Sequence, residues 1–277
     1  MSLIQSINCS GRLLSLASPK VMGIINVNKD SFYAPSRAIE MSSIMLKVNQ
    51  MFEDGAAMID LGAMSSKPGS MISLPEEEVK VLIPVIVQIL KDFPNAILSI
   101  DTVHSSVASQ AMDHGASIIN DISGGNYDTQ MLATVANGKV PFIMMHIQGL
   151  PATMHLDPKY DDVVLDIMRF FSQQIRCAKD AGITDIVIDP GFGFGKNATH
   201  NFDLIKSFEA FEIFGLPTLA GISRKSMIYR TLDVNADEAL NGTTALHMVL
   251  LQKGAKILRV HDVKEAVQCI KLYERLL

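Results

Sequence analysis

The sequence has few of the features that mark secreted or membrane-spanning proteins. It contains only three cysteines, which lie far apart and form no metal-binding or CxxC spacing: Cys9, Cys177 and Cys269. Such cysteine usage suits a reducing compartment. The N-terminus has no basic segment followed by an apolar one, so we recognise no signal peptide. The apolar runs at 81–90 and 140–147 are too short to span a bilayer.

The chain also lacks a block of basic residues and an acidic tail. Its formal net charge is -5, and residues of both signs are spread along its length. This distribution argues against a nucleic-acid-binding surface and against a disordered acidic segment. Together these absences predict a soluble cytoplasmic protein that binds neither nucleic acid nor membranes.

What the sequence does contain is a repeated pair of elements, a short apolar run followed by a helical stretch. The eight apolar runs are 21–26, 57–61, 97–100, 117–120, 140–145, 185–188, 217–220 and 256–260. The helical stretches that follow them are 38–54, 75–91, 104–114, 128–137, 161–180, 201–211, 236–253 and 263–276. Continuous apolar strands indicate burial on both faces and therefore parallel pairing.

Eight strand–helix units in this length predict an α/β fold of the (β/α)8 TIM-barrel type. Residues 1–18 alternate weakly and predict a short N-terminal hairpin. No linker divides the chain, so we expect a single domain over 1–277. The alternative is a doubly wound open sheet, which should carry GxGxxG after its first strand. Residues 27–30 read Val-Asn-Lys-Asp instead.

One stretch, residues 186–197, combines a strand with an acid and a glycine-rich turn. Asp189 ends the strand, Pro190 stops its ladder, and three alternating glycines follow at 191, 193 and 195. This pattern places a carboxylate on a rigid element beside a loop that a ligand can approach closely. The alternative interpretation is an ordinary tight turn, because glycine-rich loops are weak signals by themselves.

Polar residues stand at or just past the end of nearly every predicted strand. In a barrel these ends meet at one face, where ligand chemistry gathers. The residues are Asn26, Asp60, Asp101, Asn120, Asp121, His146, Asp189, Ser223, Arg224, Lys225, Arg259 and His261. Any one of them could be a helix cap or a loop hydrogen bond, and Asp60 and Asp121 fit a structural role as well as a functional one.

This set divides into two chemical groups. Asp101, Asn120, Asp189 and Lys225 suit a flat, hydrogen-bonding heterocycle, since a carboxylate can accept from a ring N–H and an exocyclic amine together. Arg259 and His261 face the same side of an extended strand end and, with the helix that follows, suit an anion such as phosphate.

Other residues have two open interpretations each. Asn26 offers an oxygen that could ligate a hard cation such as Mg²⁺. Met144 and Phe194 could line the faces of the heterocycle, or could simply pack in the core. His146 and His155 have no zinc-site spacing and are expected to be structural or near a substrate.

Motifs along nearly the whole chain, about residues 20–277, resemble those of the dihydropteroate synthase family. They are MGIINVNKDSF (22–32), the loop at 62–69, SIDT (99–102), IIND (118–121), MMHIQG (144–149), DPGFGFGKN (189–197), GISRKS (221–226) and LRVHDV (258–263). The resemblance implies a (β/α)8 enzyme of folate synthesis. Such an enzyme joins 6-hydroxymethyl-7,8-dihydropterin diphosphate to 4-aminobenzoate and releases diphosphate.

The resemblance also implies roles for particular residues. By the resemblance, Asp101, Asn120, Asp189 and Lys225 hold the pterin. From their positions in the sequence, Met144, Phe192 and Phe194 are candidate walls of the site, and Gly221 is a further expected substrate contact. Diphosphate and Mg²⁺ are expected at Asn26, Arg259 and His261. Ser66, Lys67 and Ser223 are expected near the substrates, with Ser223 on the aminobenzoate side. The family further implies a homodimer and a sulfonamide target.

The expected mechanism is dissociative. Mg²⁺ and Arg259 stabilise the leaving diphosphate, Asp101 and Asp189 stabilise the cationic pterin methylene, and the aromatic amine then attacks. Asp101, Asp189, Lys225 and Arg259 are therefore the expected catalytic residues. No protein nucleophile is required, which agrees with a sequence that shows no Ser-His-Asp or Cys-His arrangement.

The sequence departs from the family pattern in the loops at 28–37 and 63–67. Asn28 and Lys29 replace the usual Thr and Pro, and residues 33–36 lack the usual Asp and glycines. In the second loop, Gly, Glu, Thr and Arg are replaced by Ala63, Met64, Ser66 and Lys67. A lysine keeps the positive charge but loses the planar bidentate fork of arginine.

Two alternatives therefore stay open. A methyltetrahydrofolate-dependent methyltransferase would share the pterin carboxylates but would not need Arg259, His261 or the Ser-Arg-Lys run, all of which are present. A pterin-binding homologue without synthase activity is supported by the altered loops.

Overall fold

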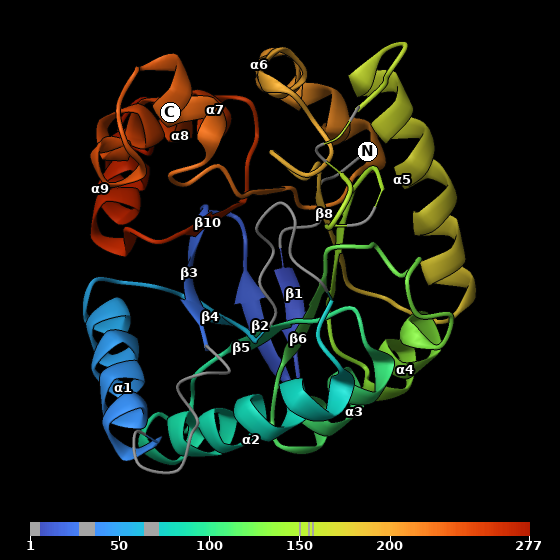
Figure 1. Ribbon diagram of the computed structural model, residues 1–277, viewed down its shortest axis with the longest axis vertical. Coiled ribbons are helices and arrows are strands. Elements are labelled where there is room, and N and C mark those ends of the chain that lie inside the picture. Colours follow the sequence, from blue (N-terminus) through green and yellow to red (C-terminus); the bar gives the residue numbers. More distant parts are fainter. Residues whose placement is uncertain (1–5, 28–36, 64–71, 150, 155, 157) are drawn as a thin grey trace.

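In the computed structural model, eight parallel strands form a nearly closed barrel, and the helices form a ring outside it (Figure 1). The structure describes residues 6–27, 37–63, 72–149, 151–154, 156 and 158–277. The strands are β3 (Lys20–Asn26), β4 (Met58–Gly62), β5 (Leu98–Asp101), β6 (Ile118–Asp121), β7 (Phe142–Met145), β8 (Ile186–Asp189), β9 (Leu219–Ala220) and β10 (Ile257–Val260).

Hydrogen bonding connects the strands in the order β8-β7-β6-β5-β4-β3-β10-β9. Neighbours in the sheet are therefore neighbours along the chain, except that the first barrel strand, β3, pairs with the last, β10. The two ends of this order meet at β8 and β9. There Ile188 forms a parallel bridge with Thr218, and its N–H donates to the carbonyl of Pro217 at 3.0 Å. A doubly wound sheet would stay open at this point. The predicted TIM barrel is therefore confirmed, and the open-sheet alternative is wrong.

The helices follow the strands as predicted, with three differences. The helices are α1 (Arg37–Glu53), α2 (Pro75–Asp92), α3 (Ser105–Asp113), α4 (Met131–Gly138), α5 (Val163–Asp180), α6 (Ala198–Lys206), α7 (Ser226–Thr231), α8 (Leu240–Gln252) and α9 (Val263–Tyr273). The predicted helix 201–211 divides into α6 and a 3-10 segment, η2 (Phe208–Phe214). The predicted helix 236–253 begins with a 3-10 turn, η3 (Ala236–Glu238), and α7 is a helix that the sequence does not predict.

Side-chain caps explain where two of these helices begin. Asp162 precedes α5, and its carboxylate accepts from the N–H groups of Val164 and Leu165. Asn197 precedes α6 and accepts from the N–H of His200, which starts that helix before the predicted residue 201. Such caps satisfy backbone donors that have no partner within the helix.

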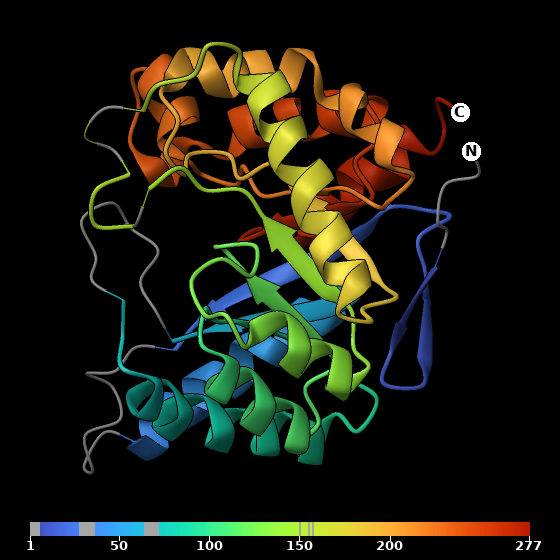
Figure 2. The ribbon, with the colours of Figure 1, turned by 90° about the vertical axis from the view of Figure 1, so that its right-hand side faces the viewer.

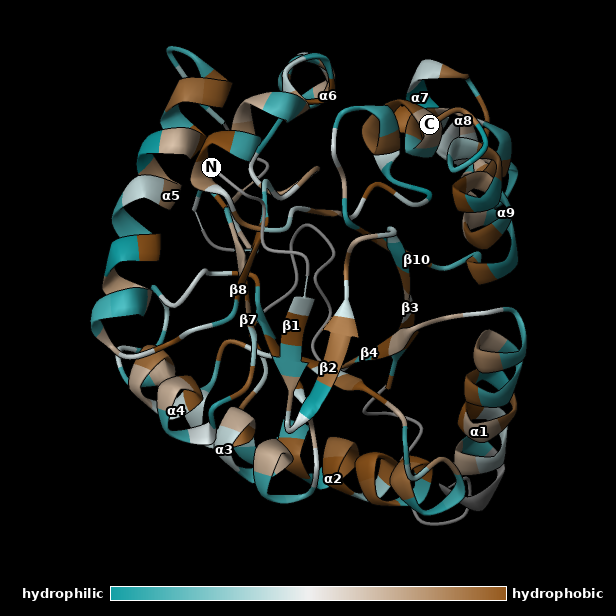
Figure 3. Cartoon of the chain, turned by 180° about the vertical axis from the view of Figure 1, so that it is seen from behind, coloured by the Kyte–Doolittle hydropathy of each residue, from teal (hydrophilic) through white to brown (hydrophobic). Residues whose placement is uncertain are grey.

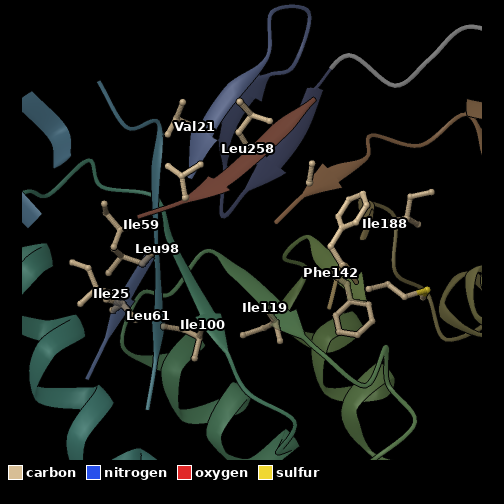
Figure 4. Close-up of a cluster of buried hydrophobic side chains, with 14 of the residues drawn as sticks. Val21, Ile25, Ile59, Leu61, Leu98, Ile100, Ile119, Phe142, Ile188 and Leu258 are labelled. Carbon is tan, nitrogen blue, oxygen red and sulfur yellow. The ribbon is translucent and has the colours of Figure 1, made fainter. Parts of the chain in front are cut away.

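Outward-facing strand residues form the main hydrophobic core beneath the helices. Figure 4 shows ten of its side chains labelled: Val21, Ile25, Ile59, Leu61, Leu98, Ile100, Ile119, Phe142, Ile188 and Leu258. Helix α5 is strongly amphipathic, and Figure 3 shows hydrophobic and hydrophilic residues alternating along it. Burying one aliphatic side chain of this core stabilises the fold by about 1.5–3 kcal/mol. None of the helices among the described residues is long and apolar enough to cross a membrane.

The predicted N-terminal hairpin is present and closes one end of the barrel. It consists of β1 (Ser6–Cys9) and β2 (Arg12–Ser15), paired antiparallel, and lies beside the barrel end in Figure 2. Ile7, Cys9 and Leu16 pack against a layer of apolar side chains in the barrel interior. That layer is Met22, Met58, Ile118, Ile143, Val187, Leu219 and Ile257. The hairpin therefore leaves only the opposite end of the barrel open to a ligand.

Candidate active site

A layer of polar side chains lies inside the barrel directly beyond the apolar layer. Side chains on a strand alternate between its faces, so a residue two positions further on points to the same side. Thus Met58 is followed by Asp60, Ile118 by Asn120, Val187 by Asp189 and Ile257 by Arg259, and Asp101 ends β5 in the same layer. Asp60, Asp101, Asn120 and Asp189 are buried. The structure therefore brings the predicted heterocycle residues together at the C-terminal mouth.

Arg259 lies at the centre of this layer. Its Nε donates to Oδ2 of Asp60 at 2.7 Å, and its Nη2 lies 2.6 Å from the same oxygen. Nη2 also donates to Oδ2 of Asp101 at 2.8 Å. Burial alone would lower the pKa of the guanidinium, but the two carboxylates outweigh burial and raise it. Arg259 is thus a fixed cation between two carboxylates.

The layer holds three carboxyl groups but only two basic side chains among the described residues. Asp60, Asp101 and Asp189 face Arg259 and Lys225, and burial raises the pKa of Asp101 to about 7 in spite of Arg259. Oδ1 of Asp101 is buried and has no hydrogen-bond partner among the described residues. An unpaired buried acceptor is unfavourable, so this oxygen is available to an N–H of a ligand.

Asp189 is held by the turn that follows it. The N–H of Gly191 donates to Oδ1 of Asp189 at 2.8 Å. Gly221 borders the other oxygen, since a Cβ at that position would lie 3.8 Å from Oδ2. Burial raises the pKa of this carboxyl, and the charge of Lys225 opposes the shift.

Lys225 approaches the same place from the loop after β9. Its Nζ donates to the carbonyl oxygen of Phe192 and lies 4.5 Å from the centre of the Phe194 ring. Burial lowers the pKa of the amine to about 8, against the attraction of Asp189. Lys225 therefore places its amine over the face of the Phe194 ring.

The glycine-rich loop at 191–195 is held by Lys196, a residue to which the sequence assigns no role. The side chain of Lys196 is buried and donates to the carbonyl oxygens of Gly191 and Phe194, each at 2.9 Å. Its Nζ also lies 3.0 Å from Nδ1 of His146. The only signal in the sequence is its place inside the 189–197 motif, and nothing there indicates burial.

Asn26 and His261 line one hollow of about 270 Å³ beside α1. Lys47, Ser43 and Glu40 lie on its helical side. The backbone N–H of His261 donates to Oγ of Ser223 at 3.2 Å, which joins the loops after β9 and β10. The ion pair between Arg224 and Asp262 joins the same loops, with two bonds of 2.7 and 2.8 Å. Asn26, Ser223 and His261 thus flank the carboxylate layer at one side of the mouth.

The match to known proteins agrees with this geometry. A family model described as "Pterin binding enzyme" matches residues 22–261. The chain belongs to the pterin-binding enzyme family. Within this family it is similar to the dihydropteroate synthase of Escherichia coli K12, with 40% identity over 266 residues that cover 95% of this chain and 94% of the relative. The synthase of Bacillus subtilis is 36% identical over 93% of this chain and 88% of its own length.

Solved structures of the family have the same fold. A Yersinia pestis dihydropteroate synthase with a sulfonamide drug complex superposes with a TM-score of 0.91 and 36% identity, over 98% of each chain. The Xanthomonas albilineans enzyme in complex with 7,8-dihydropteroate superposes with a TM-score of 0.86 and 32% identity, also over 98% of each chain.

The sequence predicts that Met144 and Phe192 line the pterin site, but both side chains turn away from the carboxylate layer. Met144 packs in the outer core beneath the helices, while its neighbour Met145 packs with Phe194 in a separate cluster at the mouth. The alternation of the strand decides between the two methionines. Phe192 is fully buried in the outer core and stacks on Phe208, with ring centres 6.0 Å apart. Only its carbonyl oxygen reaches the site.

Asp121 and His146 have structural partners. The carboxylate of Asp121 accepts from the N–H groups of Ser123 and Gly125 at 2.7 and 3.0 Å, which shapes the loop after β6.

Among the described residues, no group of three or more His, Cys, Asp and Glu side chains could hold a metal ion. Ser66, Lys67 and His155 lie outside the described residues, as do most of the two altered loops.

Proposed function

We infer that the protein is a dihydropteroate synthase, which condenses 6-hydroxymethyl-7,8-dihydropterin diphosphate with 4-aminobenzoate and releases diphosphate. Its relatives carry this name at 35–40% identity over nearly their full length. The observation that carries the inference is the inward polar layer, where Asp101, Asn120, Asp189 and Lys225 converge around Arg259. A closed apolar layer lies beneath it, so the ligand enters only from the mouth.

The pterin ring is the ligand that this layer fits best. Asp189 accepts from the ring N–H and the exocyclic amine, and Lys225 donates to the ring carbonyl on the same side. Asn120 and the unpaired Oδ1 of Asp101 take the remaining polar atoms of the ring. Phe194 and Met145 supply the apolar face.

The reaction transfers the pterin methylene from oxygen to nitrogen. The bond between the methylene carbon and the diphosphate oxygen breaks, and its electron pair leaves with the oxygen. Arg259 and His261 stabilise that charge, while Asp101 and Asp189 stabilise the positive charge left on the methylene and ring. The amine of 4-aminobenzoate then bonds to the carbon and loses a proton.

Asn26 is the proposed protein ligand for Mg²⁺. It is exposed at the end of β3 and shares its hollow with His261. One amide oxygen suits Mg²⁺, which keeps several waters and takes other oxygens from phosphate groups. When bound, the ion neutralises charge on the diphosphate.

The second substrate is placed at the outer part of the mouth. Ser223, which is buried and bonded to the loop of His261, is the described residue proposed to contact 4-aminobenzoate. Ser66 and Lys67 are proposed to complete this region. Because sulfonamides imitate 4-aminobenzoate, we expect them to compete there.

The homodimer and the cytoplasmic location remain predictions. Leu232 and Leu272 are exposed on late elements of the chain, and a second copy of the protein would cover such side chains. Light scattering of the purified protein measures the oligomeric state directly.

Product formation tests the proposed function. The protein is mixed with the pterin diphosphate and 4-aminobenzoate, and the dihydropteroate and diphosphate formed are measured. Pterin binding is measured separately by calorimetry. We expect turnover that Arg259→Ala abolishes and that the matched surface variant Arg169→Ala leaves unchanged, since the Arg169 side chain is 75% exposed. Pterin binding without diphosphate release would instead identify a non-catalytic homologue. Methyl transfer from methyltetrahydrofolate would identify a methyltransferase.

A further inference from the structure

Asp60 connects the two chemical groups of the site, although the sequence assigns it to neither. Its Oδ2 accepts from Nε of Arg259 on β10 and from Nδ2 of Asn120 on β6, at 2.7 and 3.2 Å. These strands are not neighbours of β4. One carboxylate oxygen therefore reaches past β3 on one side and past β5 on the other.

We propose that Asp60 is a positioning residue, which orients the guanidinium of Arg259 and the amide of Asn120 together and so couples diphosphate binding to pterin binding. This inference rests on the proposed synthase function. Asp60 itself lies beneath Arg259, fully buried, and acts on the substrates through these two side chains.

Folding alone does not explain a carboxylate at this position. Asp60 is completely buried, and its Oδ1 has no hydrogen-bond partner among the described residues. It also shares the single guanidinium of Arg259 with Asp101, so two like charges compete for one cation. A buried charge with an unpaired oxygen is unfavourable for stability. What the carboxylate supplies instead is a fixed direction for Arg259.

A planar guanidinium bound through Nε and Nη2 has one fixed orientation. Both nitrogens are held by Asp60, and Nη2 also by Asp101, so the plane of the group cannot rotate about the Cδ–Nε bond. Preorganised cations of this kind stabilise a leaving group without rearrangement during the reaction. Loss of Asp60 should therefore reduce kcat more than it changes KM for 4-aminobenzoate.

The charge of Asp60 also acts on Asp101. Among the charged groups that face Asp101, Arg259 lowers its pKa, and Asp60, Glu78 and Asp121 raise it; the amine of Lys225 also interacts with this carboxylate. Asp101 must be ionised to stabilise a cationic methylene. Removing the charge at residue 60 should therefore move the acidic limb of the pH–rate profile to lower pH, which a merely structural residue would not do.

The test compares Asp60→Asn with wild type and with the matched control Asp180→Asn, whose side chain is 73% exposed at the end of α5. For Asp60→Asn we expect kcat to fall roughly ten- to a hundredfold. We also expect an unchanged KM for 4-aminobenzoate, an acidic limb at lower pH, and a thermal midpoint equal to or above that of wild type. Asp180→Asn should match wild type in every measurement.

If the wild-type protein shows no turnover, the proposed synthase function is refuted. Binding measurements then still test the role of Asp60. Calorimetry with inorganic diphosphate and with 6-hydroxymethylpterin should show that Asp60→Asn weakens the binding of both ligands. The proposal would be overturned by an unchanged kcat and pH profile, or by weaker binding of only one ligand or of neither. A variant that yields less folded protein, but whose folded fraction keeps full activity and affinity, would also overturn it.

Discussion

The amine of Lys196 lies 3.0 Å from Nδ1 of His146, and both side chains are buried beneath the loop that carries Phe194. Burial, together with the charge of Lys196, lowers the pKa of His146 to about 2, so the imidazole is neutral. Nζ also donates to the carbonyl oxygens of Gly191 and Phe194, each at 2.9 Å, and lies 3.4 Å from the carbonyl oxygen of His146. The loop after β8 is therefore fixed from inside the protein.

Replacing Lys196 with Met should weaken pterin binding although Lys196 is not proposed to touch the pterin. The substitution leaves the buried carbonyl of Phe194 without this donor, at about 1–3 kcal/mol, and leaves the carbonyl of Gly191 with the N–H of Phe194 alone. The loop then loosens around Phe194 and Lys225. We expect KM for the pterin diphosphate to rise about tenfold. The control is Lys206→Met, because the Lys206 side chain is 73% exposed and forms an ion pair with Asp203 on its own helix. Wild-type pterin affinity in Lys196→Met would contradict the role assigned to this contact.

Gly191→Ala should destabilise the protein more than Gly11→Ala. Both glycines have positive φ, 70° and 84°, so both substitutions carry similar backbone strain of about 1 kcal/mol. A Cβ at 191 would also collide with the carbonyl oxygen of His146, whereas a Cβ at 11 meets nothing within 4 Å. Urea unfolding should separate the two variants by more than about 1 kcal/mol. Equal losses would mean that the loop after β8 can move away from β7.

Asp189→Asn should weaken pterin binding while the protein stays folded. The amide can still accept from the N–H of Gly191, but it can no longer accept two charge-assisted bonds from the pterin. We expect a loss of about 3 kcal/mol, which is roughly a hundredfold in Kd. Calorimetric titration with 6-hydroxymethylpterin measures this change. Asp203→Asn on the surface is the control, and wild-type affinity in Asp189→Asn would refute the proposed pterin contact.

Asp101 should make the stability of the protein fall as pH rises. Burial raises its pKa from 3.8 to about 7, so between these values the folded state holds a proton that the unfolded state has lost. The free energy of unfolding then decreases through this window, by at most about 1.4 kcal/mol per pH unit, and levels off above it.

Asp101→Asn removes this contribution. Urea unfolding at about pH 4.5 and about pH 7.5 should therefore show a smaller decrease for the variant than for wild type. The comparison cancels the effect of Asp121, whose pKa is also raised by burial and which is present in both proteins. Parallel stability curves would show that Asp101 is already ionised at low pH in the folded protein.

One cysteine should react rapidly in the folded protein and three in the unfolded chain. Cys177 is exposed on α5, while Cys9 and Cys269 are buried. Burial raises the pKa of Cys9 to about 12, which suppresses the reactive thiolate. Titration with a thiol reagent, with and without denaturant, gives the two counts, and Cys177→Ser should remove the rapid phase. A second rapid thiol in the native protein would show that the N-terminal hairpin opens.

The sequence by itself determined the barrel and most of its mouth. Eight continuous apolar runs indicate strands buried on both faces, and parallel strands place all their C-terminal ends at one edge. The sequence alone therefore predicts that Asp101, Asn120, Asp189 and Arg259 meet at that edge. These conclusions depend on local pattern and chain order, which the sequence contains.

The tertiary structure decided which side chains face inward and what each one touches. The sequence could not choose between Met144 and Met145, because a shift of one residue along a strand reverses its face. It also could not show that Asp60 joins Arg259 to Asn120, or that Lys196 reaches His146 beneath its own loop. Those contacts join residues 50 to 199 positions apart, and only closure of the barrel brings them within hydrogen-bonding distance.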